Sequence, residues 1–223
     1  MQAALASSSK ENAGNWEATA ALREAEYGNE TQAVSYARRA LRRTTSQGVR
    51  IAAALVFART GKIADALTIA NELQQQAPLD TLLLNYWLPT IRAAVALERS
   101  NSARAVRELE STRRYELGGN RPPFTAGATL YPIYLRGLAY LKLKNWAAAK
   151  TEFEKILDNK GLVWNLPTGA MARLQLARAY TGLGDQEQAH AAYQEWLNAW
   201  NRADAGTRIL QLAQQEYAGI QRQ

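Results

Sequence analysis

Apolar residues recur at intervals of three and four along most of the 223-residue chain. This is the period of an amphipathic helix, and no segment shows the strict alternation typical of a strand. The stretch "GLAYLKLKNWAAAKTEFEKIL", residues 137–157, also carries small residues in the middle of otherwise good helices. The pattern predicts an all-α protein in which helices approach one another closely at these small residues.

Short polar turns divide the helical pattern into pairs of helices: "YGNE", "RTGK", "ERSN", "LKLKN" and "GLGD". Residues 14–201 are therefore predicted to form about five helix pairs. Residues 202–223 have an apolar face opposite a polar one, as expected of a capping helix at the end of a stack. Residues 1–13 lack the apolar core of a signal peptide and are expected to be a flexible lead-in.

The fourth and fifth pairs repeat one another at a distance of 40 positions. Small residues, aromatic residues and alanines coincide at six positions in one register, which is the signature of a repeat architecture. The small residues would let the two helices of a pair touch, and the aromatic residues would fill the adjacent space. The matched positions that we expect to be structural include Gly137, Tyr140, Ala149 and Phe153 in the fourth pair, and Ala177, Tyr180, Ala189 and Tyr193 in the fifth.

The same template fits three earlier units more loosely. One alanine in the second helix of each unit marks the register: Ala33, Ala66, Ala105, Ala149 and Ala189. The spacing between these alanines varies, and the extra residues fall in "NYWLPTIRAAV", "YELGGNRPPFTAGAT" and "DNKGLVWNLPTGA". Segments rich in Gly, Pro and Asn between periodic stretches indicate insertions between helices.

The recurrent small, aromatic and alanine positions resemble the tetratricopeptide repeat, a helix pair of about 34 residues. This resemblance implies a right-handed α-α superhelix of about five helix pairs plus a C-terminal capping helix. Arg136 stands where the family places Leu, and the Trp typical of each unit start is missing.

The runs "YLRGLAYLKLKNWAAAKTEFEKILDNKGLV", "PTGAMARLQLARAYTGLGDQEQAHAAYQEWLNAW" and "ILQLAQQEYAGI" extend over about the last 90 residues. They resemble the repeat region of bacterial, particularly acidobacterial, eukaryotic-type serine/threonine kinases and of related winged-helix regulators. That resemblance implies a non-catalytic protein-interaction or sensing module of a larger signalling protein. The chain has no kinase Gly-rich loop, "HRD" or "DFG" motif, so kinase activity would belong to a domain absent from it. The alternative is a segment of a winged-helix transcriptional regulator.

Composition narrows the chemistry further. The chain has no cysteine, which excludes thiol catalysis and disulfides, and one histidine, His190, which is expected to be a surface or packing residue. Carboxylates such as Glu152 and Glu154 alternate with lysines at helical spacings, as solvated faces do. We expect no cofactor, no metal and no enzymatic activity. The apolar runs are too short to span a membrane, so a soluble protein is expected, with its compartment left open.

Two regions are candidates for binding a partner. In tetratricopeptide proteins the first helices of successive units line a concave groove, and the resemblance carries this role to Trp87, Thr90, Tyr131, Tyr134, Leu138, Leu174 and Arg178. The partner would be a protein or peptide, or a kinase or DNA-binding domain of the same protein. The second candidate is a basic patch on one helix, formed by Arg38, Arg39, Arg42 and Arg43, which suits acidic or nucleic-acid contacts; the simpler interpretation is a solvated outer face.

Overall fold

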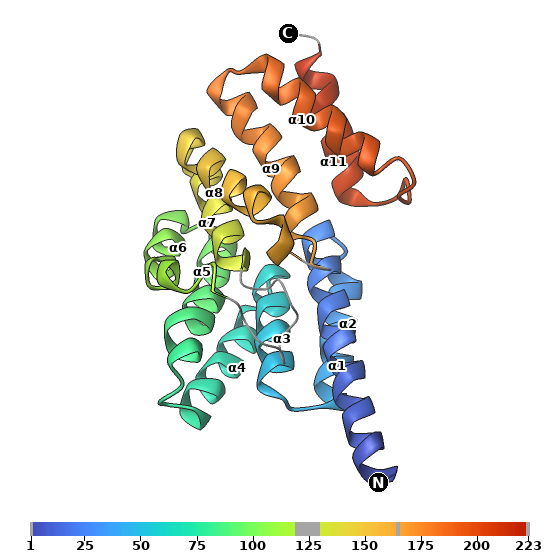
Figure 1. The fold of residues 1–223 in the computed structure, drawn as a ribbon, viewed down its shortest axis with the longest axis vertical. Coiled ribbons are helices and arrows are strands. Elements are labelled where there is room, and N and C mark those ends of the chain that lie inside the picture. The colour runs from blue at the N-terminus through green and yellow to red at the C-terminus, as the bar shows by residue number, and fades with distance from the viewer. Residues whose placement is uncertain (1, 119–129, 164–165, 222–223) are drawn as a thin grey trace.

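The computed structural model describes residues 2–118, 130–163 and 166–221, and within these ranges the chain is all-α, with eleven α-helices and no strand (Figure 1). The insertion at 119–129 and residues 164–165 of the next insertion lie outside the described residues. The α-helices are α1 (Gln2–Tyr27), α2 (Glu30–Arg43), α3 (Gln47–Arg59), α4 (Ile63–Gln76), α5 (Leu88–Glu98), α6 (Ser102–Glu108), α7 (Tyr131–Lys142), α8 (Trp146–Asp158), α9 (Thr168–Leu183), α10 (Gln186–Ala199) and α11 (Arg208–Ile220).

Five helix pairs follow one another along the described chain. Within each pair, the same kind of turn joins the first helix to the second. One residue per turn has a left-handed backbone, and the next residue donates its N–H to the carbonyl five positions earlier at 2.8–3.1 Å, which closes the first helix. Non-glycine residues occupy this conformation in the third and fourth turns. The left-handed residues are Gly28, Gly61, Ser100, Lys144 and Gly184.

The alanine that marks each unit lies five positions after this left-handed residue in all five pairs. Each of these alanines is on the second helix of its pair and has no exposed surface. The common register predicted for the five units is therefore confirmed, including the units whose sequence match was loose.

The small residues inside the helices are points of close helix contact. A Cβ atom added at Gly137 on α7 would stand 2.5 Å from Cε1 of Phe153 on α8, and one at Gly182 would stand 2.2 Å from Trp146. Distances this short leave room only for glycine. The other predicted structural positions also pack: Ala149, Phe153, Ala177, Ala189 and Tyr193 are buried, and Tyr140 and Tyr180 are half-buried against the core.

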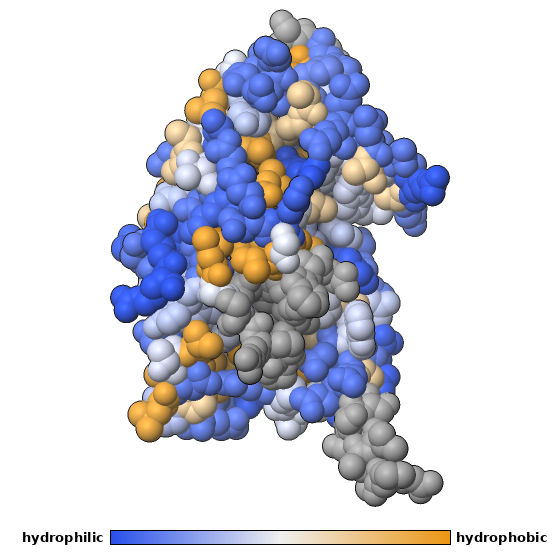
Figure 2. All heavy atoms as spheres, in the orientation of Figure 1, coloured by the Kyte–Doolittle hydropathy of each residue, from blue (hydrophilic) through white to orange (hydrophobic). Residues whose placement is uncertain are grey.

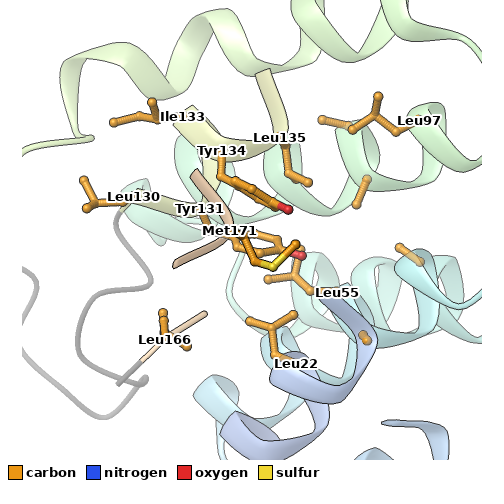
Figure 3. Packing of buried hydrophobic residues seen from close by; sticks show 14 of the residues in the cluster. Leu22, Leu55, Leu97, Leu130, Tyr131, Ile133, Tyr134, Leu135, Leu166 and Met171 are labelled. Carbon is orange, nitrogen blue, oxygen red and sulfur yellow. The ribbon is translucent and has the colours of Figure 1, made fainter. Parts of the chain in front are cut away.

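The first helices of the pairs also pack against one another, α1 on α3, α3 on α5, α5 on α7 and α7 on α9. One hydrophobic cluster extends through all five pairs and into α11. Figure 3 shows its centre, where Tyr131 and Tyr134 of α7 lie beside Met171, with Leu22 and Leu55 across from them.

The capping helix touches the first pair as well as the last. Arg208, the first residue of α11, lies against Gly28, where a Cβ would meet its Cδ at 3.3 Å. Nearby, the ring of Tyr27 makes an edge-on contact with Trp200, with centroids 4.9 Å apart. The start of α11 is thereby held close to the first turn of the stack.

Three details differ from the sequence analysis. Helix α1 begins at Gln2 and so includes residues expected to be a flexible lead-in. The segment just before Pro89, Leu83–Trp87, is a short π-helix that continues into α5. Because Pro89 has no N–H to donate to the Asn85 carbonyl, Ser111 Oγ donates to it instead at 3.0 Å. Glu152, assigned to a solvated face, is buried, because it pairs with the buried Arg136.

Arg136 is the centre of a buried ionic network. Its guanidinium binds Glu116 at 2.6 Å and Glu152 at 2.7 Å, and Lys155 reaches the far oxygen of Glu116 at 2.9 Å. Burial raises the pKa of Glu116, but the hydrogen bond and charge of Arg136, followed by those of Lys155, outweigh it, so the pKa is lowered overall. The network fastens the segment after α6 to both helices of the fourth pair.

Candidate ligand-binding hollow

A hollow of about 430 Å³ lies among the first helices of the five pairs and the capping helix. Its size falls in the range of roughly 300–1,000 Å³ that is usual for ligand pockets. Every odd-numbered helix contributes to its wall. The lining residues are Glu26 of α1, Arg59 of α3, Leu97 of α5, Tyr134, Leu138, Leu141 and Lys142 of α7, Met171, Gln175 and Arg178 of α9, and Ile209 of α11.

On one side of the hollow a bidentate ion pair joins α1 to α3. Arg59 donates to the two carboxylate oxygens of Glu26 at 2.9 and 3.2 Å, and the Tyr131 hydroxyl donates to the same carboxylate at 2.5 Å. Burial raises the pKa of Glu26, but Arg59 and the hydroxyls of Tyr131 and Tyr134 outweigh it and lower the pKa overall. Glu26 therefore stays ionised and holds Arg59 at the wall.

A second bidentate pair joins α9 to α11 at the hollow. Arg178 donates from Nε and Nη2 to the two oxygens of Glu216 on α11, both at 2.9 Å, and Tyr193 donates to Glu216 at 2.9 Å. The side chains of Arg178 and Glu216 are 24% and 36% exposed, so this pair stays in contact with solvent. The Arg178 guanidinium, which the sequence analysis assigned to a ligand, is thus already paired with the Glu216 carboxylate of the capping helix.

Lys142 adds a third cation to the hollow. Its Nζ donates to the Leu97 carbonyl at 3.2 Å, and it forms no ion pair with the residues that the structure describes. Among the described residues, the lining contains three cationic side chains and the carboxylate of Glu26, and Arg178 is also paired with Glu216, which is not a lining residue. The hollow therefore has an excess of one positive charge, that of Lys142, beside an apolar part made by leucines, Met171 and Ile209.

The sequence-predicted groove residues divide into two groups. Tyr134, Leu138 and Arg178 line the hollow. Trp87, Thr90, Tyr131 and Leu174 do not: all four are buried in the core, and the Thr90 hydroxyl donates to the Tyr86 carbonyl at 2.5 Å. Their helices are covered on several sides, so position on a first helix alone does not place a side chain in the hollow.

Other lining residues were missed, although a signal for some of them exists in the repeat itself. Glu26, Arg59 and Lys142 each lie two positions before the left-handed residue of their turn. A charged residue at this point lies at the wall of the hollow in the first, second and fourth pairs, whereas Glu98, at the same point of the third pair, does not line it. Met171, Gln175 and Ile209 carry no comparable signal.

The basic patch of α2 is partly neutralised by acidic residues. Arg39 and Arg43 both bind Glu17 of α1 at 2.7 Å, and Arg38 lies 3.9 Å from Asp65. Burial raises the pKa of Glu17, but the two arginines lower it overall. Arg42 is exposed and has no ion pair among the described residues.

The described residues contain neither a cluster of metal-ligating side chains nor a helix that could span a membrane. His190 Nε2 lies 2.7 Å from the Tyr217 hydroxyl, so the one histidine has a protein partner. In the described ranges, no three His, Cys, Asp or Glu side chains come together as metal ligands would. No described helix has both the length and the apolar character needed to cross a bilayer. Figure 2 accordingly shows hydrophilic residues over most of one face, with hydrophobic ones in smaller groups.

Comparison with known proteins adds no identity to this geometry. No protein-family model matches the chain, and no curated protein or solved structure matches it at a significant level.

Proposed function

We propose that the chain is a tetratricopeptide-like superhelix that binds a protein or peptide segment in the hollow and has no catalysis of its own. The observation that carries the proposal is the convergence of the first helices of all five pairs and α11 on one positive, partly apolar hollow. Cationic side chains suit carboxylates of a ligand, and the apolar wall suits its side chains. The favoured ligand is a short acidic segment.

As the resemblance of the last 90 residues implies, this module would belong to a larger bacterial signalling protein of the serine/threonine kinase type. It would bind either a separate partner or another domain of that protein. What supports a binding role is the lining of the hollow, which combines cationic and apolar side chains and includes Ile209 of the capping helix.

A peptide library tests this function. We expect acidic peptides to be enriched by the wild-type chain, and the affinity of a selected peptide to fall about tenfold or more in Lys142→Ala and Arg178→Ala, because each change removes a charge-assisted contact. Arg42→Ala, on the exposed face of α2, is the matched control and should bind normally. Equal loss in all three variants, or no enrichment of acidic peptides, would exclude the hollow as the binding site.

Tyr134 needs a conservative substitution in such a test. Its ring is buried, at 1% exposure, so Tyr134→Ala would remove part of the core rather than a ligand contact. Tyr134→Phe keeps the ring and removes only the hydroxyl that faces Glu26.

The second candidate, a winged-helix regulator segment that contacts nucleic acid through the α2 arginines, rests on the exposed Arg42 and its neighbours. Because Glu17 pairs with two of the four arginines, we expect such binding to be weak and to disappear as salt is raised. Tight binding at physiological salt, lost in Arg38→Ala with Arg42→Ala, would favour this candidate over the hollow.

A further inference from the structure

A second, smaller hollow of about 290 Å³ lies where α4, α5 and α6 meet, and three arginines line it. Arg92 comes from α5, Arg99 from the turn that follows, and Arg104 from α6. None of these residues lines the larger hollow. The site is therefore separate from the one on which the proposed function rests.

The arginines of this hollow are poorly neutralised. No Asp or Glu is among the described residues that line it, and within the described chain neither Arg92 nor Arg99 forms an ion pair. Arg92 donates instead to the neutral amide oxygen of Gln74 at 2.8 Å. Arg104 alone has a carboxylate, Glu108, at 3.2 Å across one turn of α6.

The other residues around the hollow add hydrogen-bond donors and an apolar surface to the three arginines. Asn101 accepts the N–H of Arg104 through its Oδ1, at 3.1 Å, which leaves its amide N–H groups available as donors. Glu98, next to Arg99 in sequence, lies beside Gly61, 3.5 Å from the position of a Cβ there. Leu67 and the buried Val95 form an apolar part of the wall.

We propose that this hollow, lined by Arg92, Arg99, Asn101 and Arg104, binds the phosphoryl group of a phosphate monoester. Guanidinium groups match phosphate oxygens in a bidentate manner, and three of them around one small space suit a doubly charged oxyanion. The apolar wall suits the carbon side of the ester. None of the described residues that line the hollow has an aromatic ring on which a nucleic-acid base could stack.

Calorimetric titration of the full chain tests the site with three probes: inorganic phosphate, N-acetyl-O-phosphoserine N-methylamide, and its unphosphorylated counterpart. We expect both phosphates to bind and the unphosphorylated compound not to bind. Tighter binding of the phosphoserine compound than of inorganic phosphate would support a phosphate monoester as the ligand. Inorganic phosphate that binds as tightly or more tightly, or no binding of either phosphate at millimolar concentration, would overturn the proposal.

Variants locate the binding. Arg99→Gln and Arg104→Gln should each weaken binding about tenfold or more, because each removes a charged donor. Glu108→Gln should tighten it, since the carboxylate that competes for Arg104 is lost. Arg107→Gln is the matched control: the residue is exposed on the same helix but does not line the hollow.

Two results would contradict the proposal. Equal weakening in Arg107→Gln would indicate diffuse attraction by the basic surface. Affinity for single-stranded oligonucleotides that rises with length and exceeds that of the phosphoserine compound would indicate a polyanion surface instead. Circular dichroism and melting temperature confirm folding of each variant, and all four substituted side chains are at least partly exposed.

Discussion

Gly137 of α7 packs directly against the ring of Phe153 on α8, with no space for a side chain between them: a Cβ at Gly137 would lie 2.5 Å from the ring. Phe153 has no exposed surface and is enclosed by the core, so it cannot move aside at little cost. The close approach of the two helices of the fourth pair depends on this contact.

Gly137→Ala should therefore lower the free energy of unfolding by about 1–3 kcal/mol, the usual cost of overpacking, despite the better helix propensity of alanine. Urea denaturation measures the change. Gly219→Ala on α11 is the control, because a Cβ there meets no atom within 4 Å; it should be neutral or slightly stabilising. A loss of the same size in both variants would contradict the packing explanation.

Lys144→Gly should stabilise the protein by up to about 1 kcal/mol, because Lys144 has a left-handed backbone, φ 56°, that glycine adopts without strain. The added freedom of glycine in the unfolded chain limits the gain. Leu143→Gly, one residue earlier at φ −82°, is the control and should destabilise. Thermal melting of both variants measures the effect; destabilisation by Lys144→Gly would show that its side chain matters more than its backbone.

Arg136→Met should lower the free energy of unfolding by about 3–5 kcal/mol, because it leaves Glu116 and Glu152 buried without their main partner. The triple variant with Glu116→Gln and Glu152→Gln should recover part of that loss, since the uncompensated charges are gone. Denaturant unfolding of the three proteins measures it. If the triple variant is less stable than Arg136→Met alone, buried charge is not the cause.

The free energy of unfolding should decline below about pH 4.5, which is the ordinary pKa of the two glutamates concerned, Glu26 and Glu116. The pKa values of Glu26 and Glu116 are lowered in the folded state. Their contribution to stability is therefore complete above the pKa that they have in the unfolded chain, and it is lost as pH falls through the lower pKa values that they have in the folded protein. Unfolding free energies measured between about pH 7 and pH 3 should show this slope.

Glu26→Gln should flatten part of that slope, because the substituted side chain cannot take up a proton. Glu110→Gln serves as the control, since Glu110 is on the surface, with its side chain 66% exposed. An acid slope unchanged in Glu26→Gln would mean that its pairing with Arg59 does not contribute to acid sensitivity.

The sequence alone determined the helices, the five turns and the register of the five alanines. These features are local: a 3.6-residue apolar period, a polar turn and a small residue at a helix contact depend on neighbours a few positions away. For this reason the loosely matched first three units have the same turn geometry as the last two.

Only the tertiary structure decided which side chains face the hollow and which ions are buried. Residues Tyr131–Gly137 of α7 are all buried, so the apolar pattern does not indicate which side of this helix faces a particular neighbour. The pairing of Arg136 with Glu116, and of Arg178 with Glu216, joins segments 20 and 38 positions apart. Such pairs depend on how the units stack, and a periodic pattern contains no information about the stacking.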